Sequence, residues 1–188
     1  MQNDCVAVMV KPRVFLLVIA LTAMGCKERL VSPPCSPDAT VMMGEQYGVR
    51  YCAHLEDALG CSRETGRPVL LLFDAYAQSN HACWDVLANE GVQAVIRDRL
   101  VLCVLMVDDC KALSPEDLID FPQLKSNPLN IGQRNSSLES EFFGKASQPL
   151  FTQVNSDFVT LAEPLGYIPK KNADELADWL EAALAKIP

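Results

Sequence analysis

Hydrophobic residues in this chain fall into short continuous runs and into amphipathic stretches between them. Residues 69–73 and 100–107 are continuous apolar runs, a pattern typical of strands buried on both faces of a sheet. Residues 150–154 and 158–161 are further candidate strands, joined by the polar turn 155–157. We therefore expect a sheet in which the buried strands come first and a hairpin follows.

Amphipathic stretches with helical spacing alternate with these runs. Residues 53–64 form one expected helix, and residues 82–88 form the next, which residues 91–97 continue after a break at Gly91. Residues 173–185 form the last helix, with its leucines on one face. This order predicts an α/β fold with a mixed central sheet and helices on both of its faces.

The segment 108–146 is too long to be a structureless loop inside a compact domain. Ser114 begins one expected short helix within it, and Ser136 with Glu139 begins another, which Gly144 ends. We therefore expect an insertion that contains short helices.

The N-terminal segment predicts export. Residues 14–25 are apolar, follow Lys11 and Arg13, and are too short for a bilayer core, which needs about 20 residues. A basic flank and a short apolar core indicate a signal peptide over residues 1–25. The cysteine that follows, Cys26, resembles the acylated cysteine of a bacterial lipoprotein. The alternative is an ordinary cleaved signal with an unmodified Cys26.

The proline-containing residues 26–44 then read as a tether, and residues 45–188 as the folded domain. The expected location is the periplasmic side of the bacterial cell envelope, with the lipid anchor in the membrane.

Composition narrows the chemistry further. The 188-residue chain has a net charge of −8 and no basic cluster, which argues against a nucleic acid as partner. Its 2 histidines, His54 and His81, leave little room for a histidine-rich metal site. The sequence contains no pair of CxxC motifs, the ligand spacing typical of a structural zinc site. We therefore expect no metal and no cofactor.

The chain has 8 cysteines, which favours an oxidising compartment. Cys5 leaves with the signal peptide, and Cys103 is expected to pack in the core of a buried strand. We expect structural disulfides among Cys35, Cys52, Cys61 and Cys110. The pairing stays open at this point, because the cysteines that remain after acylation of Cys26 allow many connectivities: Cys35, Cys52, Cys61, Cys83, Cys103 and Cys110.

One group of residues points to a family. Asp74 ends the first buried run, Asn80-His81-Ala82-Cys83 opens a helix six residues later, and Gln148-Pro149 opens a later strand. This order resembles the thioredoxin-like domain of thiol:disulfide interchange proteins of the DsbD type, in their Bacteroidetes-like version. The resemblance extends over roughly residues 53–185. It includes further short matches: Val107-Asp108-Asp109, Ile131-Gly132, Phe143-Gly144 and Ala146-Ser147-Gln148-Pro149.

The resemblance implies a Cys-x-x-Cys site, and this chain departs from it at the first position. Asn80 stands where the family has the cysteine that attacks the substrate disulfide, and an amide cannot do that step. Cys83 occupies the resolving position. The alternative for Cys83 is that of a small buried apolar residue.

The same resemblance implies roles for further residues, and each of these residues also has a purely structural alternative. Asp74 would assist proton transfer at the resolving cysteine, or only cap a backbone at a strand end. His81 would favour a thiolate, or be an ordinary exposed residue of a first turn. Gln148 and a cis-bonded Pro149 would shape a substrate groove, or serve the fold alone.

These residues imply a thiol:disulfide interchange lipoprotein with weak or lost redox cycling. Its substrates would be proteins that carry thiols or disulfides, or extended peptides. The alternatives are a thioredoxin-fold protein that only binds peptides and a structural envelope lipoprotein. Whether the chain is an enzyme stays open at this point.

Overall fold

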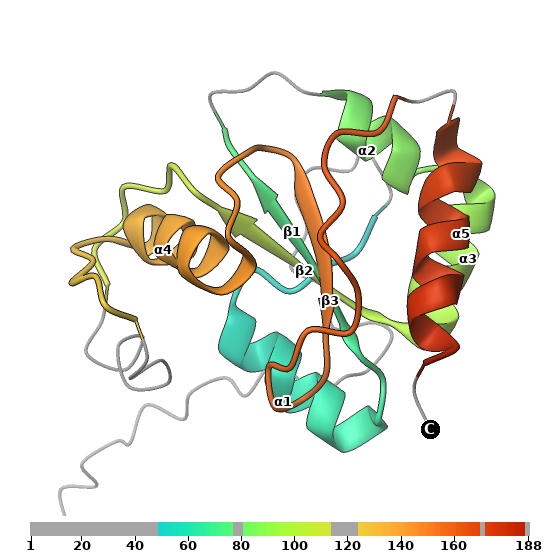
Figure 1. The fold of residues 1–188 in the computed structure, drawn as a ribbon, viewed down its shortest axis with the longest axis horizontal. Helices are drawn as coiled ribbons and strands as arrows, with labels where there is room; N and C mark the ends of the chain where they lie inside the picture. Colours follow the sequence, from blue (N-terminus) through green and yellow to red (C-terminus); the bar gives the residue numbers. More distant parts are fainter. Residues whose placement is uncertain (1–48, 77–80, 114–123, 170–171, 187–188) are drawn as a thin grey trace, which may run out of the picture. The chain divides into compact units, whose positions relative to one another are not determined.

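The computed structural model describes residues 49–76, 81–113, 124–169 and 172–186, with the side chains of residues 81 and 82 excepted (Figure 1). The expected signal peptide and tether lie outside these residues, as does the helix expected at Ser114. Within the described residues, no helix is both long and apolar enough to cross a membrane. The elements are α1 Leu55–Thr65, β1 Val69–Asp74, α2 His81–Leu87, α3 Glu90–Arg99, β2 Val101–Met106, α4 Ile131–Phe143, β3 Leu150–Val154 and α5 Ala173–Leu184.

A mixed sheet of three strands forms the centre, in the order β2-β1-β3. β1 is parallel to β2 and antiparallel to β3. Every residue of β1 and β2 is buried, because both faces of these strands are covered. The continuous apolar runs therefore form the buried strands that the sequence predicts.

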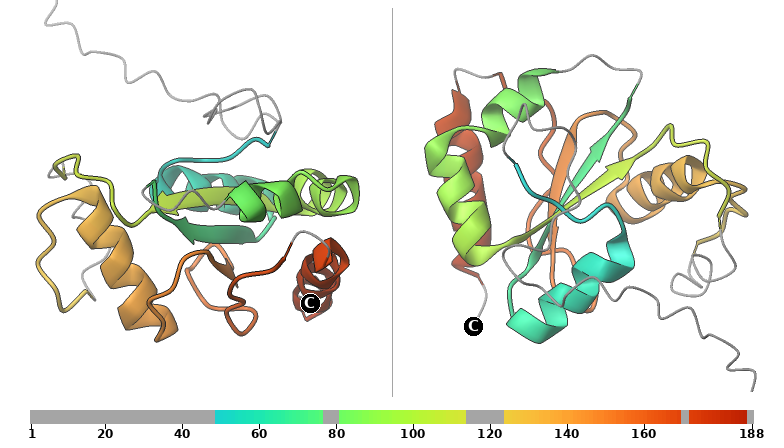
Figure 2. Two further views of the ribbon diagram at one scale, coloured as in Figure 1. Left: turned by 90° about the horizontal axis from the view of Figure 1, so that it is seen from above. Right: turned by 180° about the vertical axis from the view of Figure 1, so that it is seen from behind.

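Side chains of the sheet alternate between two apolar clusters, as the period of a strand requires. On one face, Leu70 and Leu72 of β1 pack with α2, α3 and α5. On the other face, Leu71 and Phe73 pack with α1 and α4. Figure 2 shows α3 and α5 side by side along one flank of the sheet and α4 along the other. The expected α/β fold, with helices on both faces of a mixed sheet, is confirmed.

The expected strand at residues 158–161 is wrong. This segment makes one isolated bridge to β3, at Thr160, and the chain makes a second one further on, at Leu165. The Asn155 side chain accepts hydrogen bonds from the backbone N–H groups of Asp157 and Val159. Phe158 has a φ of 62°. The registers of the Val154–Thr160 and Phe151–Leu165 bridges differ by two residues, so no continuous ladder forms between them.

Two helix boundaries also differ from the expectation, both because an asparagine caps the helix. Asn89 accepts hydrogen bonds from the N–H groups of Gly91 and Val92, so the break between α2 and α3 precedes Gly91. Asn130 caps α4 by accepting from the N–H of Gln133. The helix expected to begin at Ser136 therefore begins at Ile131, and it ends at Gly144 as expected.

The remaining features agree with the thioredoxin-like arrangement. The Gln148–Pro149 peptide bond is cis, and β3 follows it directly. The chain then closes with α5, which packs against α3. The strand pairing and the terminal helix thus bring segments far apart in the sequence to one end of β1.

Candidate functional site

The candidate site lies at the C-terminal end of β1. In the antiparallel pairing of β1 with β3, Phe73 lies opposite Leu150. Asp74 directly follows Phe73 and Pro149 directly precedes Leu150, so both lie at this end of the pairing between β1 and β3. The fold therefore joins the strand-end acid to the proline turn, two features that are far apart in the sequence.

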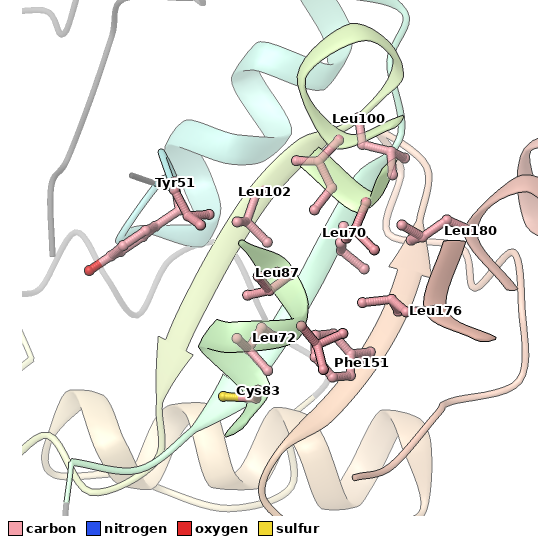
Figure 3. Packing of buried hydrophobic residues seen from close by; sticks show 14 of the residues in the cluster. Tyr51, Leu70, Leu72, Cys83, Leu87, Leu100, Leu102, Phe151, Leu176 and Leu180 are labelled. Atoms are coloured by element: carbon pink, nitrogen blue, oxygen red, sulfur yellow. The ribbon is translucent and has the colours of Figure 1, made fainter. Parts of the chain in front are cut away.

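Cys83 approaches the same acid from the first turn of α2. Its thiol donates a hydrogen bond to Oδ2 of Asp74, with an S···O distance of 3.6 Å. The indole Nε1–H of Trp84 donates to the same oxygen at 3.2 Å. Asp74 is only 3% exposed and Cys83 only 1%. Cys83 lies at one end of the apolar cluster, beside Leu72 (Figure 3).

Burial and mutual proximity raise the pKa values of both groups. Burial raises the pKa of Asp74, and the hydrogen bonds from Trp84 and Cys83 only partly oppose this. Burial also raises the pKa of the Cys83 thiol, and the negative charge of Asp74 adds to it, so that this pKa is about 12. At neutral pH Cys83 is therefore a thiol, whereas the nucleophile in disulfide exchange is a thiolate.

The proline turn is anchored by a buried acid, Glu139, which the sequence pattern predicted at the start of a helix. Glu139 of α4 is fully buried. It accepts hydrogen bonds from the N–H of Ser147 at 2.9 Å and from Nε2 of Gln148 at 2.8 Å. Gln148 is half-buried and Pro149 is buried. α4 thus fixes the backbone immediately before the cis bond.

Aromatic residues extend the site toward the edge of the sheet. The ring of Tyr51 packs on that of Trp84, with centroids 5.7 Å apart. Tyr51 and Tyr76 line a hollow of about 190 Å³ together with His54, Asp109 and Lys111, among others. No pattern in the sequence predicted these aromatic residues as part of a site. A signal was present in Trp84, which directly follows Cys83.

Two of the short family-like matches meet in the structure. The N–H of Gly132 donates to the backbone oxygen of Asp109 at 2.8 Å. A Cβ at Gly132 would lie 2.6 Å from the nitrogen of Asp109 and 2.7 Å from the oxygen of Val107. The start of α4 and the loop after β2 therefore pack so closely that only glycine fits.

Other expected site residues are only partly described. Asn80 and Cys26 lie outside the described residues. The backbone of His81 begins α2, and its side chain is not described. Within the described part of the chain, no group of three or more His, Cys, Asp or Glu side chains is arranged to hold a metal ion.

The states of the cysteines agree with only part of the expected set of disulfides. Cys61 is in a disulfide, as expected. Cys52 and Cys110 are free, so their assignment to structural disulfides is wrong. Cys52 instead pairs through its backbone with Cys103, which is fully buried in the core as expected.

Among known proteins, the chain is similar to solved structures. No family model and no curated protein matches the chain. The structure is similar to "DsbH Oxidoreductase", with 14% identity over 76% of this chain and 93% of that one, and a TM-score of 0.46. It is also similar to a thioredoxin from Thermus thermophilus, with 18% identity over 72% of this chain and 88% of that one, and a TM-score of 0.47. At these identities the function must follow from the residues of the site itself.

Proposed function

We propose that this chain is a thioredoxin-family thiol:disulfide interchange lipoprotein of the bacterial cell envelope, with weak or lost redox cycling. The supporting observation is the Cys83 thiol that donates to the buried Asp74, at the end of the β1–β3 pairing where the cis Pro149 also lies. This is the arrangement that a resolving cysteine and its proton acceptor need.

The first step of interchange is the one that this site lacks. Attack on a disulfide requires a thiolate, and Cys83 has a pKa of about 12 and almost no exposed surface. Asn80 carries no sulfur. Cys83 is therefore suited to resolve a mixed disulfide, passing its proton to Asp74, and unsuited to begin the reaction.

The test restores the missing sulfur. Asn80→Cys should raise the rate of insulin disulfide reduction well above that of the unaltered chain, because a new attacking thiol then precedes Cys83 by three residues. The double variant Asn80→Cys with Cys83→Ser should lose efficient cycling and accumulate a mixed disulfide. Cys83→Ser alone serves as the matched control, and it should not show the gain in rate that Asn80→Cys brings.

A second function, peptide binding without redox cycling, is favoured by the burial of Cys83 and by the anchored turn at Gln148 and Pro149. An extended peptide would pair with backbone beside this turn. If Asn80→Cys folds normally and gains no reductase activity, this second function replaces the first.

The proposal includes export and anchoring. The short apolar segment that precedes Cys26 supports cleavage before that residue and its acylation. Acylation would place the domain on the periplasmic side of a membrane, where its partners would be exported proteins that carry thiols or disulfides.

A further inference from the structure

A second pair of cysteines lies at the edge of the sheet that β2 forms. Cys52, just before α1, forms an isolated parallel bridge with Cys103 of β2. The N–H of Cys52 donates to the oxygen of Leu102 at 2.8 Å, and the N–H of Val104 donates to the oxygen of Cys52 at 3.0 Å. These bonds fix the register that places the two cysteines side by side.

The two side chains point to the same face of the sheet. Cys103 belongs to the apolar cluster beneath α1, and Cys52 packs against that cluster. Neighbouring strands lie about 4.8 Å apart. Disulfides join α-carbons separated by roughly 4.4–6.8 Å, so this spacing suits a disulfide. Both cysteines are free thiols in the structure.

We propose that Cys52 and Cys103 form a second redox site, a dithiol that closes to a disulfide by exchange with a small disulfide such as glutathione disulfide. This site is separate from Cys83, which lies in the cluster on the opposite face of the sheet. The proposal does not depend on the function proposed above.

Exposure sets the order of the steps. Cys52 is partly exposed and Cys103 has no exposed surface, so the oxidant meets Cys52 first. The Cys52 thiolate attacks one sulfur of glutathione disulfide, forms a mixed disulfide and releases one glutathione thiolate. The Cys103 thiolate then attacks the Cys52 sulfur and releases the second glutathione. Two thiol protons leave the protein, and two electrons reduce the oxidant to two thiols.

The surroundings make this exchange slow at neutral pH. Burial raises the pKa of Cys52 to about 11, Asp57 adds to the increase and Arg67 opposes it. Burial also raises the pKa of Cys103 well above its usual value, and the neighbouring Cys52 adds to that effect. The site is therefore expected to respond to sustained oxidation rather than to cycle rapidly.

The test equilibrates the mature chain at pH 8 in glutathione buffers that range from reduced to oxidised. Acid quenching, alkylation in denaturant and peptide mapping then report each cysteine separately. We expect Cys52 and Cys103 to lose alkylation together over the same range of buffers. Their two peptides should be recovered as one linked species, two hydrogens lighter than the sum of the separate peptides.

Three variants separate this outcome from adventitious oxidation. Cys103→Ala should stop at a glutathione adduct on Cys52, and Cys52→Ser should leave the buried Cys103 unmodified. Cys110→Ser removes an exposed free thiol and should leave the linkage unchanged. The proposal is overturned if Cys52 and Cys103 both stay alkylatable where Cys110 carries glutathione, or if Cys52 is linked to Cys61 instead.

Discussion

The charge of Asp74 controls the proton on Cys83, and the variant Asp74→Asn tests this directly. The substitution keeps the shape of the side chain and an oxygen that can accept from Trp84, but it removes the negative charge. Burial, the largest cause of the raised thiol pKa, remains in the variant. The next two causes are the negative charge of Asp74 and its hydrogen bond with Cys83. In Asp74→Asn the charge disappears and the hydrogen bond weakens. The pKa of Cys83 should therefore fall but stay above its ordinary value of 9.0.

The size of the effect follows from the titration law. With a pKa of about 12, roughly one Cys83 in ten thousand is a thiolate at pH 8, and each unit of decrease raises that fraction about tenfold. We expect Asp74→Asn to raise the thiolate fraction, with an upper limit of about a thousandfold because the pKa stays above 9.0.

The assay follows the Cβ carbon resonance of labelled Cys83 between pH 7 and 10.5. In the unaltered chain the resonance should stay flat over this range, whereas in Asp74→Asn it should begin to move. Asp57→Asn is the matched control, because Asp57 is an exposed acid on α1 that raises the pKa of Cys52 and is not among the causes at Cys83. An unchanged Cys83 titration in a folded Asp74→Asn protein would refute the coupling.

The same substitution has a consequence for stability, with a defined sign. The folded state raises the pKa of Asp74, so folding favours its protonated form and stability is lost as the pH rises through that pKa. Asp74→Asn should remove this loss. The free energy of unfolding of the variant, relative to the unaltered chain, should therefore be greater at pH 7 than at pH 3.

The remaining predictions concern packing and export. Gly132→Ala should destabilise the fold by more than about 1 kcal/mol in urea unfolding, because its Cβ would meet the backbone at 2.6 Å. Gly60→Ala, a glycine in α1 with nothing within 4 Å, should instead stabilise it by about 0.5–1 kcal/mol, and a destabilised Gly60→Ala would contradict the packing argument. Mass spectrometry of the mature N-terminus should find an acylated Cys26, and an intact leader or an unmodified Cys26 would exclude the anchor.

Continuous apolar runs made the sheet predictable, whereas local side-chain bonds set the details that were missed. The runs that became β1 and β2 are apolar throughout because both faces are covered, and runs of this length are typical of buried strands. The break between α2 and α3 and the start of α4 were misplaced because the Asn89 and Asn130 side chains accept hydrogen bonds from backbone N–H groups. Such bonds depend on which competing backbone conformation wins, and a pattern of apolar and polar residues does not encode that choice.

The site shows the same division. The family resemblance implied that Asp74 acts on Cys83, and the structure has a hydrogen bond between the two side chains. The roles of Trp84 and Glu139 depend on tertiary contacts. Glu139 looks like an ordinary polar helix residue in the sequence, and only the packing of α4 beneath the proline turn buries it.

The two buried acids support the proposed function over that of a purely structural lipoprotein. Asp74 and Glu139 both have raised pKa values because burial penalises their charged forms. An apolar side chain at either position would avoid this cost, since buried charged groups are often replaced by hydrophobic residues without loss of stability. Yet one acid holds the Cys83 thiol and the other holds the backbone before Pro149. Both buried acids therefore lie in the candidate site. There, a proton acceptor would serve a reaction, and a fixed turn would serve a reaction or a bound peptide.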